Sequence, residues 1–209
     1  MKNLTRYIIS TSGGEVIQRA SIENVCEKFE ADPKYIINYM TAYGYLIRIV
    51  KGIYYVKTWD EFSSKKAVDV HRVLSLGLDE LGVSWYFGLN TALRMNGATH
   101  EYSDTVFVLN DRIYRNKEVK IAEAKVKFIK ISPKLVGFGV VAENGVRYSD
   151  LEKTLLDMIY LSKYRSVPEG RIALTVEGYA KGADHGKARN YIGAYPLNVG
   201  KVAKNAGLI

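Results

Sequence analysis

The sequence has little of what several protein classes require. Its single cysteine, Cys26, cannot form an internal disulfide, which fits a reducing cytosol. The longest runs without a charged side chain, residues 35–47 and 81–93, are shorter than the roughly 20 apolar residues that a membrane-spanning helix needs. Residues 1–15 contain neither a sustained apolar run nor a small-residue cleavage site. We therefore expect a cytoplasmic protein with no secretory signal and no membrane span.

Signatures of catalysis and of metal binding are also scarce. His71, His100 and His185 lie far apart in the sequence, and none has a Cys or His partner at the spacing of a zinc site. The letters of residues 137–142, GFGVVA, fit a dinucleotide-binding fingerprint, but a hairpin is expected after them instead of the helix that must face the pyrophosphate. We therefore predict no enzyme activity, no cofactor and no metal.

What the sequence has in excess is positive charge. It contains 30 Lys and Arg residues against 22 Asp and Glu residues, a net charge of +8. This surplus favours a polyanionic partner such as nucleic acid or anionic lipid. Residues 181–209 hold five basic residues and one acid, a net +4 of that total. The tail therefore supplies the residues that we predict as secondary phosphate contacts: Lys187, Arg189, Lys201 and Lys204.

Helical signals dominate the first part of the chain. A short helix is expected over residues 4–11, followed by a β-favouring run over residues 16–20. Ser21 is positioned as the N-cap of a second helix whose apolar stripe includes Cys26, which favours core packing for this thiol over reactivity. Asp32 and Pro33 form an N-cap and N1 pair that predicts the start of a third helix.

A β-hairpin is expected directly after the third helix. Residues 45–50 and 53–57 are β-rich, and Lys51-Gly52 between them is a two-residue turn with glycine placed for positive φ. Helix, strand, helix, helix and hairpin is the order of a winged helix-turn-helix. The sequence therefore predicts a DNA-binding domain over residues 1–60, with double-stranded DNA as the partner.

The expected DNA-contacting residues lie on the third helix and on the hairpin. A helix that enters the major groove needs polar groups on its outward side, and basic residues nearby to contact phosphates. The alternative to DNA contact is that these helices form only a small core, and that their exposed side is polar because it faces solvent. We favour DNA contact, and the predicted contacts are Lys34, Tyr35, Asn38, Thr41, Arg48 and Lys51.

Beyond a polar segment over residues 58–65, a mixed α+β domain is expected over residues 66–209. Helical patterns occupy residues 67–81 and 88–95, strand patterns occupy residues 104–109 and 125–131, and Asn144-Gly145 indicates a hairpin within residues 140–148. Three more helical stripes follow Arg171. The whole chain is therefore predicted to belong to the α+β class.

The strongest helix start in this second part is at Ser149. We expect a capping box in which Ser149 and Glu152 bond each other's backbone amides. Glu152 and Asp157 lie on opposite sides of that helix, so they are not expected to form a catalytic carboxylate pair. Lys153 is instead the expected ion-pair partner of Asp157 at i, i+4 spacing.

Three sequence blocks occur in an order that resembles the AbiEi antitoxin family. They are KGIYYV at residues 51–56, WYFGLNTAL at residues 85–93 and YSDLEKTLLD at residues 148–157. The resemblance implies a winged-helix autorepressor that reads repeats upstream of its own operon in a type IV toxin-antitoxin system. It also implies opposition to a nucleotidyltransferase toxin without a stable complex.

Two other classes of function stay open at this stage. The chain could be a winged-helix protein-interaction module whose tyrosine-rich surface is an interface, or a stand-alone regulator without a toxin. It could also be an enzyme or a small-ligand sensor with a pocket in residues 66–209.

Overall fold

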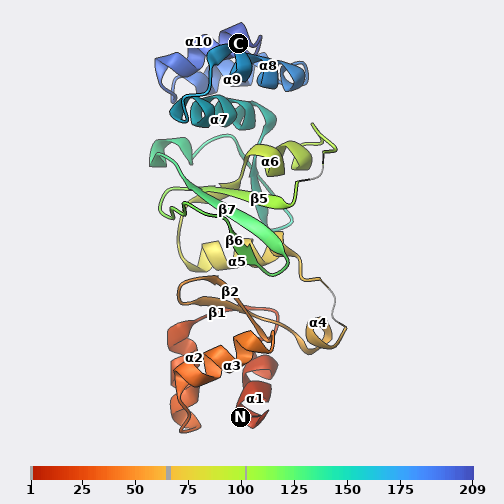
Figure 1. Cartoon of the computed structure of the whole chain (residues 1–209), viewed down its shortest axis with the longest axis vertical. Coiled ribbons are helices and arrows are strands. Elements are labelled where there is room, and N and C mark those ends of the chain that lie inside the picture. Colours follow the sequence, from red (N-terminus) through yellow and green to blue (C-terminus); the bar gives the residue numbers. More distant parts are fainter. Residues whose placement is uncertain (1, 65–66, 102) are drawn as a thin grey trace. The chain divides into compact units, whose positions relative to one another are not determined.

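The protein has a mixed α+β fold. The computed structural model describes residues 2–64, 67–101 and 103–209, and in these ranges α-helices are combined with two β-sheets (Figure 1). The α+β class predicted from the sequence is confirmed at this level. Among the helices of these ranges, none is both long and apolar enough to cross a bilayer.

The chain forms two compact units. The first unit contains the chain up to Val83 together with the short segment Lys120–Ala124. The second unit contains Ser84–Val119 and Lys125–Ile209. The first unit is thus assembled from two separate stretches of sequence, and each unit is described by itself below.

The segment in which the sequence suggested a domain boundary, residues 58–65, contains a short helix. Helix α4 (Trp59–Ser63) begins at a capping box in which Thr58 and Glu61 exchange side-chain to backbone hydrogen bonds of 3.1 and 2.9 Å. Helix α5 (Val70–Glu80), expected in the second domain, belongs to the first unit. Residues 65 and 66, where the expected boundary ends and the second domain would begin, lie outside the described residues.

Three helices form the apolar core of the first unit. They are α1 (Lys2–Ser12), α2 (Arg19–Lys28) and α3 (Pro33–Ala42). Each buries one stripe, because its apolar residues recur every three or four positions. Cys26 is fully buried, as its position in the stripe predicts. The buried helix residues are Leu4, Ile8, Ile9, Ile22, Cys26, Ile36, Ile37 and Met40.

The start of α2 differs from the prediction. Ser21 lies inside the helix, and Gln18 occupies the N-cap position without a side-chain hydrogen bond. The assignment of Ser21 as the N-cap is therefore wrong. The physical reason is that the amide of Arg19 donates a 2.8 Å hydrogen bond to the carbonyl of Gly52, so one free amide at the helix start is satisfied by backbone.

The first unit also contains a three-stranded antiparallel sheet. Strands β1 (Val16–Gln18), β2 (Leu46–Val50) and β3 (Ile53–Val56) are arranged in the order β1-β3-β2. The predicted hairpin is confirmed, since Lys51 and Gly52 connect β2 to β3 and Gly52 has a φ of +84°. Strand β2 lies at the edge of the sheet, and β3 lies in the middle.

Helix α5 packs against all three strands of this sheet. Val73, Leu74 and Leu78 are fully buried on this helix. At Gly77 the helix approaches β2 so closely that a Cβ atom would lie 2.4 Å from Cδ1 of Ile49. The sheet of the first unit therefore packs against α5 in addition to α1, α2 and α3.

The second sheet is mixed and has the strand order β6-β7-β5-β4-β9-β8. Strand β4 pairs antiparallel with β5 and parallel with β9, whereas β5 and β7 are parallel. The hairpin predicted at Asn144-Gly145 is confirmed between β8 and β9, and both turn residues have positive φ, of 50° and 76°. The strands are β4 (Trp85–Phe87), β5 (Thr105–Asn110), β6 (Val119–Ile121), β7 (Ala124–Lys130), β8 (Val140–Glu143) and β9 (Val146–Ser149).

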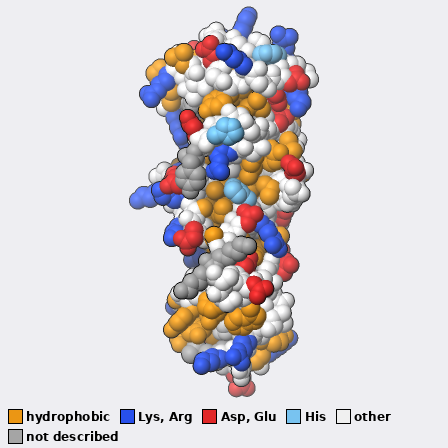
Figure 2. Space-filling view, turned by 90° about the vertical axis from the view of Figure 1, so that its right-hand side faces the viewer, with side chains coloured by type: hydrophobic (Ala, Val, Ile, Leu, Met, Phe, Trp, Pro, Cys, Tyr) orange, Lys and Arg blue, Asp and Glu red, His pale blue; other side chains and the backbone are white. Residues whose placement is uncertain are grey.

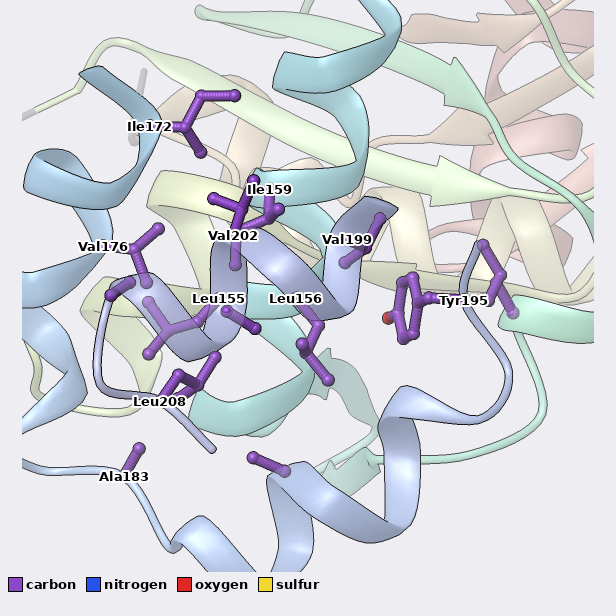
Figure 3. Packing of buried hydrophobic residues seen from close by; sticks show 14 of the residues in the cluster. Leu155, Leu156, Ile159, Ile172, Val176, Ala183, Tyr195, Val199, Val202 and Leu208 are labelled. Carbon is purple, nitrogen blue, oxygen red and sulfur yellow. The ribbon is translucent and has the colours of Figure 1, made fainter. Parts of the chain in front are cut away.

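Helices form the larger part of the core of the second unit. Helix α6 (Leu89–Met95) follows β4, and the 3₁₀ turn η1 (Pro133–Leu135) follows β7. The C-terminal helices are α7 (Leu151–Tyr164), α8 (Glu169–Ala180), α9 (His185–Ile192) and α10 (Leu197–Asn205). Buried side chains of α8 and α10, such as Val176 and Val202, share one cluster with Leu155 and Ile159 of α7 (Figure 3).

The start of α7 also differs from the prediction. Asp150, one residue after Ser149, is the N-cap, and its carboxylate accepts a 2.9 Å hydrogen bond from the amide of Lys153. The hydroxyl of Ser149 lies 2.7 Å from that of Thr154, and the carboxylate of Glu152 accepts a hydrogen bond from the amide of Asp184. The predicted capping box is therefore wrong, because both of its side chains have other partners.

Candidate nucleic-acid interface

Helix α3 is fixed on one side and exposed on the other. Its start matches the prediction, with Pro33 at the first position and the carboxylate of Asp32 accepting a 2.9 Å hydrogen bond from the amide of Lys34. Ile36 and Met40 are at most 1% exposed and hold the helix against the core of the first unit. The orientation of the outward side is therefore set by buried contacts along the helix.

The outward side of α3 carries four of the predicted contacts. Lys34, Tyr35, Asn38 and Thr41 are all exposed. Together they present an ammonium group, two hydroxyl groups and a carboxamide. These groups can donate hydrogen bonds to phosphate oxygens, and the carboxamide can both donate to and accept from a base edge.

A ridge of tyrosines runs along the same helix. Tyr35 and Tyr43 are 53% and 61% exposed, and the ring of Tyr39 lies with its centroid 4.6 Å from that of Tyr43. Burial raises the pKa of the Tyr39 hydroxyl. Figure 2 shows hydrophobic and basic side chains next to each other on the surface of the first unit.

The hairpin supplies the other two predicted contacts. Arg48 is the one exposed residue of β2, and Lys51 is exposed at the turn. The turn is anchored to α2 through the hydrogen bond from Arg19 to Gly52. All six predicted residues therefore lie exposed on the first unit, on α3 and the β2–β3 hairpin.

The structure places two further lysines beside these residues. A groove of about 500 Å³ in the first unit is lined by Thr41, Arg48, Lys57 and Lys120, among other residues. Lys120 Nζ lies 3.1 Å from Oε2 of Glu123, which also lines the groove. Sequence reasoning missed Lys120, because no local pattern connects residue 120 with the hairpin, and it did not single out Lys57 at the end of the predicted hairpin.

The predicted secondary phosphate contacts belong to the second unit. Lys187 and Arg189 lie on α9, Lys201 and Lys204 lie on α10, and all four are exposed. Lys187 Nζ is 4.0 Å from the carboxylate of Asp150. These residues are therefore spread over two helices of a different unit from the first six.

The most perturbed titratable groups of the chain are buried in the second unit. The predicted pair of Lys153 and Asp157 is confirmed, with a 3.3 Å separation and at most 1% side-chain exposure. Asp157 also accepts 2.7 Å hydrogen bonds from the hydroxyls of Tyr86 and Tyr195, and Lys153 donates to the carbonyl of Leu135. Burial raises the pKa of Asp157 and lowers that of Lys153.

The polar groups of this cluster are paired within the second unit. Each of its polar groups has a partner within the protein, and Lys153 lies 4.5 Å from the ring centroid of Phe138. A buried pair that loses one partner leaves an uncompensated charge, so the pair fixes α7 in the core. In the part of the chain that the structure describes, no group of three or more His, Cys, Asp or Glu side chains is placed to hold a metal ion.

Comparisons with known proteins show similarity of fold. No family model matches the sequence, and no curated protein matches it. The structure is similar to the crystal structure of the RV2827C protein from Mycobacterium tuberculosis, with a TM-score of 0.56 at 10% sequence identity. The alignment covers 98% of this chain and 76% of that chain.

Proposed function

We propose that the chain is a DNA-binding transcriptional regulator whose first unit is a winged helix-turn-helix. The observation that carries this proposal is the outward side of α3, where Lys34, Asn38 and Thr41 are exposed while the opposite side is buried. The exposed Arg48 and Lys51 on the adjoining hairpin support it further. A helix that reads a DNA groove requires one exposed polar side and one buried side, as α3 has.

In the proposed mechanism, α3 enters the major groove and the protein occludes a promoter. Asn38 reads a base edge, because a carboxamide can pair with both the N6 amino group and N7 of adenine. Lys34, Arg48 and Lys51 contact phosphates and release counterions, which supplies affinity without sequence preference. The net charge of +8 favours the same partner.

The finer proposal is a cytoplasmic autorepressor and antitoxin of the AbiEi type, without catalytic activity. It rests on the order of the three resembling sequence blocks, which coincide with architectural elements. KGIYYV contains the hairpin turn and β3, WYFGLNTAL contains β4 and most of α6, and YSDLEKTLLD spans the end of β9 and the first half of α7. Its functional partner is a nucleotidyltransferase toxin that it opposes without a stable complex.

Footprinting on the region upstream of the protein's own reading frame tests the regulator proposal. We expect protection of a discrete operator that overlaps the promoter, with affinity falling linearly on a log–log plot against salt concentration. Binding that is equally weak on the upstream region and on a shuffled sequence of the same composition would contradict it. A neighbouring reading frame for a nucleotidyltransferase-like protein, whose toxicity this chain relieves, is expected for the antitoxin role.

The tyrosine ridge favours a second candidate function, a protein-interaction module. Tyr35, Tyr39 and Tyr43 are spaced four residues apart on α3 and its C-cap, and tyrosine is enriched at protein interfaces. Light scattering and pull-down with the neighbouring gene product separate the two functions. A stable complex in high salt, combined with no gel shift on upstream DNA, would support the interaction module over the regulator.

A further inference from the structure

We infer that the groove beside α3 is a second phosphate-binding site, which holds a stretch of the DNA backbone next to the segment that α3 reads. Lys57 and Lys120 are the residues that this inference adds to the interface. The inference rests on the proposed function, because it assigns part of the same DNA to a different surface of the first unit.

The charges of the groove favour a phosphodiester. Arg48 comes from β2, Lys57 follows β3, and Lys120 comes from the separate segment Lys120–Ala124. Two cations of one hairpin and a third from a distant part of the sequence thus line one groove. Glu123 is the acid among its lining residues, and it is paired with Lys120. The excess of positive charge is what a backbone with one negative charge per phosphate requires.

The position of the groove connects it to α3. Thr41, in the last turn of the helix, and Arg48, on the edge strand, belong both to the groove lining and to the predicted contacts. Leu46 and Ile47 also line the groove, and with exposed fractions of 2% and 8% they form its buried floor. A strand that passes over the end of α3 can therefore continue along Lys57 and Lys120.

The salt dependence of operator binding tests this inference. In the full-length protein, Lys57→Ala and Lys120→Ala are each expected to lower the slope of log affinity against log salt by about one unit. The loss should be equal on the operator and on shuffled DNA, because phosphate contacts carry no base information. Lys134→Ala removes an exposed lysine of the second unit and is the control, with an unchanged slope expected.

Glu123→Gln gives a test of opposite sign. Removing this carboxylate should raise the affinity for DNA by about twofold to fivefold. The gain is small because Lys120 and Glu123 are 68% and 81% exposed and form a weak pair. A gain of binding cannot arise from misfolding. Unchanged or weaker binding by Glu123→Gln would overturn the assignment of Lys120 to phosphate contact.

Lysine acylation with mass-spectrometric readout examines the unsubstituted protein. Operator duplex should protect Lys57 and Lys120, whereas inorganic pyrophosphate at matched ionic strength should not. Protection by pyrophosphate alone would assign the groove to a small phosphorylated ligand and overturn the inference. If the duplex binds but neither lysine is protected, the groove inference fails while the proposed function stands; if no duplex binds at all, both fail.

Discussion

At the scale of single residues, the proposed interface assigns base reading and phosphate anchoring to different side chains. Asn38 sits in the middle of the exposed side of α3, and its carboxamide has separate donor and acceptor atoms that can pair with one base edge. Lys51 sits at the hairpin turn and offers only a mobile ammonium group. Removing the two side chains should therefore have different effects on DNA binding.

We expect Asn38→Ala to cost about 1–3 kcal/mol at one base position and to relax the preference there. Lys51→Ala should weaken binding to all sequences alike and reduce the salt slope by about one unit. Fluorescence anisotropy on a set of operator variants at several salt concentrations measures both effects. Equal losses for the two variants on every sequence would show that the division between reader and anchor is wrong.

The buried tyrosines of the second unit lead to a prediction for alkaline pH. Burial, together with the neighbouring carboxylate of Asp157, raises the pKa of both Tyr86 and Tyr195 in the folded protein. Unfolded tyrosine loses its proton near pH 10, so above that pH the unfolded state binds fewer protons than the folded state. The free energy of unfolding should therefore fall by about 1.4 kcal/mol per pH unit for each such tyrosine.

Tyr86→Phe isolates this effect. The substitution should lower stability at neutral pH, because Asp157 loses a hydrogen-bond donor, and should make the alkaline slope shallower by about 1.4 kcal/mol per pH unit. Urea unfolding between about pH 9 and pH 11 measures the slope. Tyr164→Phe, at a ring that is 83% exposed, is the control and should leave it unchanged. An unaltered slope in Tyr86→Phe would contradict the prediction.

At the scale of helices and strands, the sequence correctly predicted helix starts and hairpin turns that depend only on adjacent residues. Asp32 with Pro33 marked the start of α3, and Asn144-Gly145 marked the β8–β9 hairpin, because capping and positive φ depend on adjacent residues. The capping roles of Ser21 and Ser149 were predicted wrongly. In both cases a distant partner decides the outcome: the carbonyl of Gly52 for α2, and the amide of Asp184 for the Glu152 carboxylate of α7.

The approach of α5 to β2 gives an element-scale prediction. Gly77→Ala should lower the free energy of unfolding by about 1–3 kcal/mol, because its Cβ would meet the side chain of Ile49. Gly178→Ala is the matched variant on α8, where a Cβ meets nothing within 4 Å, and it should raise stability by about 0.5–1 kcal/mol. Thermal or urea unfolding measures both. A gain in Gly77→Ala as large as in Gly178→Ala would show that α5 does not approach β2 this closely.

At the scale of the whole molecule, the sequence pattern predicted the α+β class and the exposure of the six candidate contacts. It could not predict that Lys120–Ala124 joins the first unit, because no periodicity links that segment to the hairpin. Lys120 was missed for that reason. The sequence pattern also predicted the pairing of Lys153 with Asp157. It did not predict the burial of this pair, which depends on Tyr86 and Tyr195, 71 and 38 positions away from Asp157 in the sequence.

The central claim, that the outward side of α3 lies in the major groove, is tested most directly by site-specific disulfide trapping. Asn38→Cys is combined with an operator duplex that carries a thiol tethered to a cytosine N4 in the major groove. We expect rapid cross-linking of this variant, and none of the unsubstituted protein, whose Cys26 is fully buried, or of Thr175→Cys on α8, where no DNA contact is predicted. A duplex that binds Asn38→Cys but forms no cross-link at any major-groove position would contradict the account.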